Sequence, residues 1–155
     1  MRCISLWQPW ASFWAWGIKI HETRGWHTNY RGELLIHAAK RKADAEDLEY
    51  YEDIFELIGK TPKDLVYGAL IGRGNLVACK RTEVVQFETT KIDLVLGDFS
   101  DGRFAWELRD VQEFAQPIPY RGSQGFFDVP RDILLPAVGS VVLPTVEPLQ
   151  RSLWS

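Results

Sequence analysis

The sequence has few cysteines, no long apolar run and no excess of basic charge. Its two cysteines, Cys3 and Cys79, are too few for a disulfide framework or a zinc knuckle, and they suit a reducing cytoplasm. No apolar stretch approaches the roughly 18 residues of a membrane-spanning helix. Trp7, Gln8 and Pro9 interrupt any signal-peptide pattern at the N-terminus. We therefore expect a cytoplasmic protein with no membrane span.

The charge balance excludes a bulk polyanion binder, because the net charge is −3 and such proteins are usually strongly basic. A local basic patch remains at residues 37–42, which include Lys40. The three histidines are His21, His27 and His37, and they lie in three separate segments. They form no HExxH pattern and have no partner cysteine pair. We expect no metal site and no cofactor.

Aromatic residues are abundant instead, with seven tryptophans in 155 residues. Trp10, Phe13 and Trp14 share one face at helical spacing, which predicts a core helix over 8–17. Trp7 lies off that face. An indole outside the core is free to stack on a base.

The remaining pattern predicts one α+β domain. Strands are expected at 2–6, 18–24, 33–38 and 67–79 (with a possible extension through 87), one or two further strands at 102–114, and a second helix at 43–59. Such a chain forms a curled sheet of five to six mostly antiparallel strands with two main helices packed at one side. Residues 136–155 are expected to form a mobile C-terminal extension.

The charged segment "KIHETR" suggests acid–base chemistry. As a strand it would place Lys19, with His21 and Thr23, on one face, and Glu22 with Arg24 on the other. A lysine beside a carboxylate can transfer protons, and an arginine fork can bind phosphate. A solvated strand face with a surface ion pair explains the same spacing.

The segment "YRGSQGF" sets Ser123 and Gln124 between two glycines. Backbone N–H groups of such a loop can hold an anion, and a glutamine can hydrogen-bond a base edge. A flexible turn is the alternative. No Ser-His-Asp order or nucleophile elbow predicts a serine nucleophile.

Four stretches together resemble the ASCH domain family: "ISLWQPWASFWAWGIKIHETRGW", "YRGELLIHAAKR", "LIGRGNLVAC" and "GRFAWELRDVQEFAQPIPYRGSQGFFDV". They cover most of residues 4–129. The opening Ser-x-x-Gln-Pro-Trp-Ala is similar to a bacterial and phage subgroup, itself similar to the activating signal cointegrator 1 homology domain. The resemblance implies a PUA-like curved β-barrel over residues 1–135.

The resemblance also implies a cleft for RNA or modified nucleosides. Some members of the family are N4-acetylcytidine amidohydrolases, others are ribonucleases and others bind nucleic acids. Lys19 matches the amidohydrolase lysine, whereas Glu22 stands where those enzymes have threonine. Their distant glutamate has four candidate positions, namely Glu88, Asp93, Asp98 and Glu107.

We therefore expect RNA, or a modified nucleotide or nucleoside, to bind in this cleft. The expected ligand-binding residues are Trp7 and Trp26 for stacking, Gln8 and Gln124 for base edges, Arg24 and Lys40 for phosphate, and Ser123. The alternative is a hydrolase of RNA or N4-acylcytidine with Lys19 and Glu22 as acid/base residues. On either hypothesis we expect the Lys19→Ala variant to keep its fold and to lose ligand binding or turnover. A third hypothesis is an interaction domain that docks a partner through its acidic helix.

Overall fold

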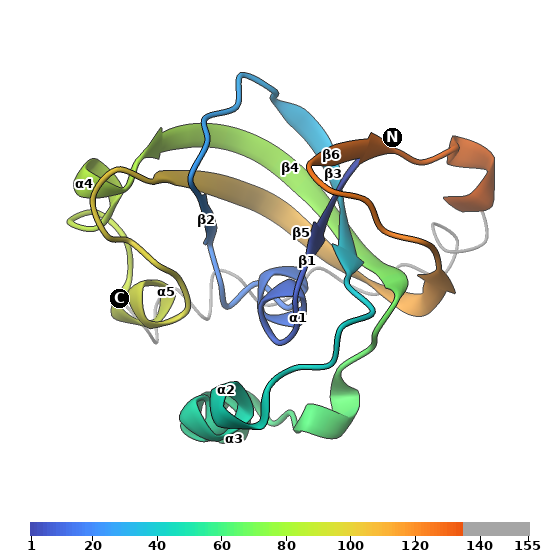
Figure 1. Cartoon of the computed structure of the whole chain (residues 1–155), viewed down its shortest axis with the longest axis horizontal. Coiled ribbons are helices and arrows are strands. Elements are labelled where there is room, and N and C mark those ends of the chain that lie inside the picture. Colours follow the sequence, from blue (N-terminus) through green and yellow to red (C-terminus); the bar gives the residue numbers. More distant parts are fainter. Residues whose placement is uncertain (135–155) are drawn as a thin grey trace.

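A six-stranded curled sheet is the frame of the protein, with strand order β2-β5-β4-β3-β1-β6 (Figure 1). The computed structural model describes residues 1–134. All neighbouring strands are antiparallel except β1 and β3. The strands are β1 (Arg2–Leu6), β2 (His21–Arg24), β3 (Gly32–Ala38), β4 (Ala69–Arg81), β5 (Phe104–Pro119) and β6 (Phe126–Asp128). The α+β class and the mostly antiparallel, curled sheet are confirmed. The extension expected at 136–155 lies outside the described residues.

The curl depends on two glycines of β4. A Cβ atom on Gly72 would lie 2.7 Å from the Gln112 carbonyl oxygen, and one on Gly74 would lie 2.7 Å from Cγ of Leu108. The β4–β5 register shifts between Leu70 and Gly72 and again between Arg73 and Asn75. Because only glycine permits this approach, the two long strands bend together into a half-barrel.

Helix α1 (Trp10–Ala15) packs inside the curl, where Phe13 and Trp14 are fully buried (Figure 1). Gly17, with φ of 81°, ends the helical segment. A turn follows, so β2 begins only at His21. The predicted strand over 18–24 is therefore too long, and Lys19 precedes the strand rather than alternating within it.

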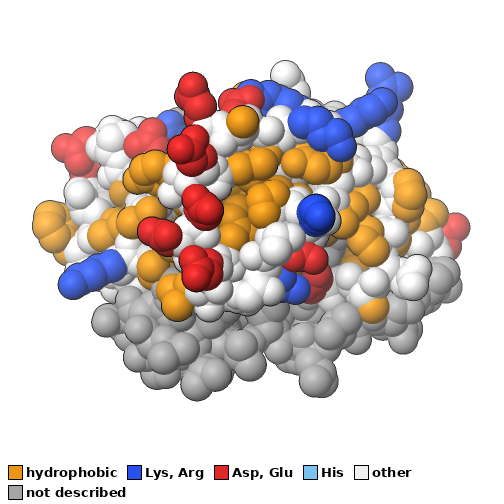
Figure 2. Space-filling view, turned by 90° about the horizontal axis from the view of Figure 1, so that it is seen from below, with side chains coloured by type: hydrophobic (Ala, Val, Ile, Leu, Met, Phe, Trp, Pro, Cys, Tyr) orange, Lys and Arg blue, Asp and Glu red, His pale blue; other side chains and the backbone are white. Residues whose placement is uncertain are grey.

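The acidic helix predicted at 43–59 is two short helices, α2 (Ala45–Tyr50) and α3 (Glu52–Ile58). Tyr51, with φ of −96° and ψ of 13°, separates them because its ring is drawn into the core beside Phe13. Figure 2 views the molecule from the side on which they lie, with acidic side chains mixed among apolar ones. The acidic residues of the two helices are Glu46, Asp47, Glu49, Glu52, Asp53 and Glu56.

A strand extension through residue 87 was wrong, because the chain turns into α4 (Thr82–Val85). The buried Thr82 hydroxyl donates to the carbonyl of Ser100 at 2.8 Å, and this bond fixes the turn. Helix α5 (Lys91–Val95) follows. Among the helices between Met1 and Leu134, none has the length and hydropathy needed to cross a membrane.

Candidate functional site

Two neighbouring cavities share a wall made by Ser5, Trp7 and Arg24. The first cavity, of about 560 Å³, lies between β2 and residues 96–98, and Glu22 and Trp10 also line it. The second cavity, of about 1250 Å³, lies between the end of β3 and the loop 120–125. The strands β1 and β2 therefore carry side chains that reach both cavities.

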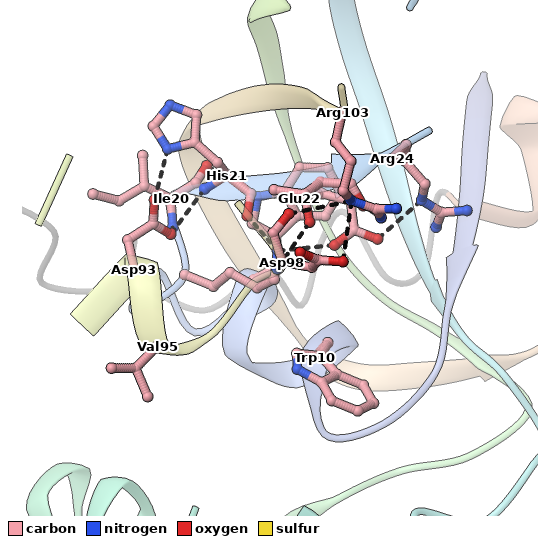
Figure 3. Close-up of polar contacts among 12 residues, drawn as sticks. Trp10, Ile20, His21, Glu22, Arg24, Asp93, Val95, Asp98 and Arg103 are labelled. Atoms are coloured by element: carbon pink, nitrogen blue, oxygen red, sulfur yellow. Dashed lines mark hydrogen bonds and ion pairs between the residues drawn. The ribbon is translucent and has the colours of Figure 1, made fainter. Parts of the chain in front are cut away.

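A buried ionic chain forms the floor beside the first cavity. Lys19 is 1% exposed, and its ammonium donates to Glu22 Oε1 at 2.8 Å and to the His21 carbonyl. Arg24 Nε donates to Glu22 Oε2 at 3.0 Å (Figure 3). Its Nη2 also donates to the Ser5 carbonyl at 3.1 Å. Glu22 faces the cavity, whereas Lys19 lies behind it, so the chain holds the carboxylate rigid from two sides.

The electrostatics of this chain keep Glu22 ionised. Burial alone raises the pKa of Glu22, but the charges and hydrogen bonds of Lys19 and Arg24 outweigh burial and lower it below its usual range. A carboxylate held in this state accepts protons or hydrogen bonds but is a poor proton donor at neutral pH.

The opposite face of β2 carries a second polar cluster. His21 Nδ1 lies 2.7 Å from Asp93 Oδ2, and the other oxygen of Asp93 accepts the backbone N–H groups of Ile20 and His21 (Figure 3). Burial raises the pKa of Asp93, but its bonds and charge interactions with His21 outweigh that and lower it. This cluster ties β2 to α5.

Of the four candidates for a distant catalytic carboxylate, one lies with Glu22. Asp98 lines the first cavity with Arg103, whose Nε is 3.5 Å from Oδ2 of Asp98. Asp93 is committed to His21, Glu88 lies 3.9 Å from Lys80, and Glu107 pairs with Arg109. No group of three or more metal-binding side chains occurs within residues 1–134.

Two exposed indoles border the second cavity. Trp7 is 55% exposed, with the Arg41 guanidinium 4.0 Å above its ring. Trp26 is 39% exposed and packs edge-on against Trp106, with ring centroids 4.6 Å apart. Both rings therefore present a supported apolar surface next to the cavity.

The second cavity is cationic. Arg24, Lys40 and Arg121 line it, and none of the described residues that line it is aspartate or glutamate. The loop 120–125 adds Ser123 and Gln124, both exposed. Among residues 1–134 the backbone N–H groups of 121–124 make no hydrogen bond, so they remain available as donors. The arrangement suits an anionic ligand with a flat ring.

A serine and a histidine meet at the cavity wall. Ser5 Oγ lies 2.8 Å from His37 Nδ1, and His37 Nε2 lies 2.7 Å from the Tyr120 carbonyl oxygen. Burial lowers the pKa of His37, although the bond to Tyr120 opposes the shift, so the ring stays neutral at pH 7. Neither Ser5 nor His37 was among the residues predicted to form the site. The alternating pattern of the two segments predicted both strands, but the pairing of Ser5 with His37 depends on how β1 and β3 align in the sheet.

The predicted residues divide accordingly. Trp7 and Arg24 line both cavities, Glu22 lines the first, and Trp26, Lys40, Ser123 and Gln124 line the second. Lys19 lines neither of them. Gln8 is 0% exposed, and its amide donates to Ser12 Oγ and the Val66 carbonyl and accepts from the Ser12 N–H. The structure thus places Gln8 as a support for α1 and not at the cavities. Arg121 was not predicted.

Two curated proteins are similar to this chain in sequence. Activating signal cointegrator 1 of Homo sapiens is 32% identical over 125 residues, and that of Mus musculus is 31% identical over 125 residues. Each match covers 78% of this chain and 21% of the relative, so the chain spans about a fifth of those proteins.

Solved structures agree with the architecture. The crystal structure of ASCH from Zymomonas mobilis has a TM-score of 0.58 at 15% identity, covering 91% of this chain and 95% of that one. A tyrosine-to-phenylalanine mutant of the same protein gives a TM-score of 0.55 at 15% identity, covering 91% and 98%. Residues 4–118 match the ASCH domain. The chain therefore belongs to the ASCH domain family.

Proposed function

We propose that this ASCH domain binds RNA or a modified nucleotide or nucleoside in the second cavity. The observation that carries the proposal is the composition of the wall: two exposed indoles and three cationic side chains, with no carboxylate among the described lining residues. Aromatic faces stack bases without regard to sequence, and cations neutralise phosphates.

Each ligand group has a partner in this arrangement. A base stacks on Trp7, which is the more exposed of the two indoles and is backed by Arg41. Phosphate lies between Arg24, Lys40 and Arg121, where an arginine fork binds two oxygens at once. The unpaired N–H groups and Gln124 of the loop read a base edge or hold a further oxygen.

The size of the cavity favours a short single strand. Its volume of about 1250 Å³ exceeds the roughly 300–1,000 Å³ of ordinary small-molecule pockets, so one or two nucleotides fit. A duplex would need a broad cationic surface, and the net charge of the protein is −3.

The test is the affinity of end-labelled single-stranded RNA of four to six nucleotides, measured by fluorescence anisotropy. Trp7→Ala should weaken binding about 5- to 150-fold, because stacking contributes about 1–3 kcal/mol per base. Phe87→Ala is the matched control, since Phe87 is 85% exposed and lines neither cavity. Equal affinities of the wild type and the Trp7→Ala variant would sink the proposal.

A second candidate is hydrolysis of RNA or of N4-acylcytidine at the first cavity. The observation that favours it is the ionised Glu22 at the cavity wall, 2.8 Å from the Lys19 ammonium. Glu22 would act as base, with Lys19 positioning it. Glu22→Gln should then abolish acetate release from N4-acetylcytidine, or cleavage of RNA, while anisotropy still reports RNA binding. Turnover that survives Glu22→Gln would exclude this candidate.

A further inference from the structure

The Ser5–His37 pair has the geometry of an activated nucleophile. A backbone carbonyl only accepts hydrogen bonds, so His37 Nε2, at 2.7 Å from the Tyr120 oxygen, carries the ring proton. His37 Nδ1 is then the acceptor for the Ser5 hydroxyl at 2.8 Å. A neutral imidazole that accepts a serine proton and is oriented by a third group is the arrangement used for nucleophilic catalysis.

The surroundings of the pair fit this role. Ser5 is half-buried and lines both cavities, and His37, although only 1% exposed, lines the second cavity beside it. Gly122 lies directly over the pair, because a Cβ atom there would be 2.6 Å from His37 Cε1 and 3.2 Å from Ser5 Oγ. The loop that contains Gly122 therefore passes close to the serine oxygen, and its backbone N–H groups are the candidates for stabilising an oxyanion there.

We propose that Ser5 is the nucleophile of an esterase activity that removes an O-acyl group from a nucleotide held in the second cavity. The assignment of the ester to a nucleotide rests on the proposed function. The assignment of the nucleophile rests on the Ser5–His37–Tyr120 geometry alone.

The reaction balances with water as the only co-reactant. The Ser5 proton passes to His37 Nδ1 while Oγ bonds to the ester carbonyl carbon. The bond between that carbon and the alcohol oxygen breaks, and the departing nucleotide hydroxyl takes the proton from Nδ1. Water then attacks the acyl-serine with His37 as base again, which releases the carboxylic acid and restores the Ser5 hydroxyl.

An ester suits this pair better than an amide. The third group is a neutral carbonyl and not a carboxylate, so it stabilises the imidazolium that forms on His37 less strongly than aspartate would. Departure of an amine needs full protonation of its nitrogen by His37, whereas an alkoxide is the better leaving group and depends less on that proton. We therefore expect O-acyl substrates to turn over and N-acyl substrates not to turn over at Ser5.

The test combines a fluorophosphonate probe with a defined ester. Wild-type protein is incubated with the probe, the adduct is mapped by mass spectrometry, and acetate release from 3′-O-acetyl-adenosine 5′-monophosphate is measured. The adduct should lie on Ser5, and Ser5→Ala should lower ester turnover about 100-fold or more, within the range of general acid–base catalysis. Ser100→Ala is the matched control, because Ser100 is an exposed serine that lines neither cavity and whose hydroxyl donates to Asp98 and not to a histidine.

His37→Gln should remove both labelling and turnover, and circular dichroism on each variant reports whether the fold is intact. If the His37→Gln variant does not fold, the Ser5→Ala variant, which lacks a single oxygen atom, still tests whether Ser5 is the nucleophile. RNA affinity is measured on the same preparations. RNA binding by wild type without a Ser5 adduct would overturn the esterase and leave the proposed function intact. A Ser5 adduct without binding of RNA or adenosine monophosphate would keep the nucleophile and overturn its nucleotide substrate.

Discussion

At the residue scale, the buried Lys19 is the clearest departure from what the sequence suggested. A surface lysine of a strand could be truncated without harm, but Lys19 is 1% exposed and pairs with Glu22. Its removal leaves a buried carboxylate with only Arg24 as partner. We expect Lys19→Ala to lower the free energy of unfolding by about 3–5 kcal/mol, the usual cost of breaking a buried pair.

Urea denaturation measures this cost, with Lys91→Ala as the control on an exposed lysine. The control should change the free energy of unfolding by no more than about 0.5 kcal/mol. A Lys19→Ala protein as stable as the control would mean that the ion pair contributes nothing.

Asp93 leads to a prediction on acid stability. Its pKa in the fold lies below the ordinary value of 3.8, because the interactions with His21 outweigh burial. A carboxylate whose pKa is lower in the folded than in the unfolded protein stabilises the fold at pH values above its unfolded-state pKa. This stabilisation is lost as the pH falls through its folded-state pKa. Asp93→Asn should therefore be destabilised at pH 7, and its stability should fall less steeply than that of wild type as the pH falls below the ordinary value of 3.8.

Thermal unfolding followed at a series of pH values tests this prediction. Parallel acid limbs for the wild type and the Asp93→Asn variant would show that Asp93 does not titrate with folding.

At the element scale, the loop 120–125 is positioned by the absence of a side chain at Gly122. Gly122→Ala would push a Cβ atom to 2.6 Å from the His37 ring, so the loop must move away from Ser5. We expect weaker RNA binding by this variant with little change in the melting temperature. Gly25→Ala is the control, because a Cβ there has nothing within 4 Å. Unchanged RNA affinity in Gly122→Ala would show that the loop does not form part of the site.

Some of the helices and strands could be predicted from sequence patterns and others could not. β1, β3 and β4 were predicted because alternation and glycine spacing are local signals. α4 was missed because Thr82 turns the chain through bonds to Ser100 and Arg103, which lie about 20 residues away. The Ser5–His37 pair was missed for the same reason, since it depends on the register of two parallel strands whose paired residues are 32 apart.

The site shows the same limit. Local composition picked out Trp7, Arg24 and the glycine-rich loop, and the structure brings them to one cavity. The directions of the Lys19 and Gln8 side chains were not predicted from the sequence. The turn at 17–20 places Lys19 outside the strand, and Gln8 points inward and supports α1.

At the scale of the whole molecule, charge is distributed unevenly. Acidic side chains concentrate on α2 and α3, visible in Figure 2, whereas the second cavity carries Arg24, Lys40 and Arg121. A net charge of −3 therefore coexists with a cationic groove. Three phosphate contacts predict that the logarithm of RNA affinity falls with the logarithm of salt concentration with a slope of about −2.

Arg121→Gln should reduce that slope by about 0.7, the share of one phosphate contact to a single strand. Lys91→Gln, away from both cavities, should leave it unchanged. An affinity that does not depend on salt would contradict phosphate recognition.

An NMR titration of ¹⁵N-labelled protein with short single-stranded RNA, observed at the tryptophan indole N–H signals, tests directly whether RNA binds in the second cavity. Binding in the second cavity predicts saturable shifts of the Trp7 and Trp26 signals, with those of the buried Trp14 and Trp16 unmoved. Unshifted Trp7 and Trp26 signals at saturating RNA would contradict the account.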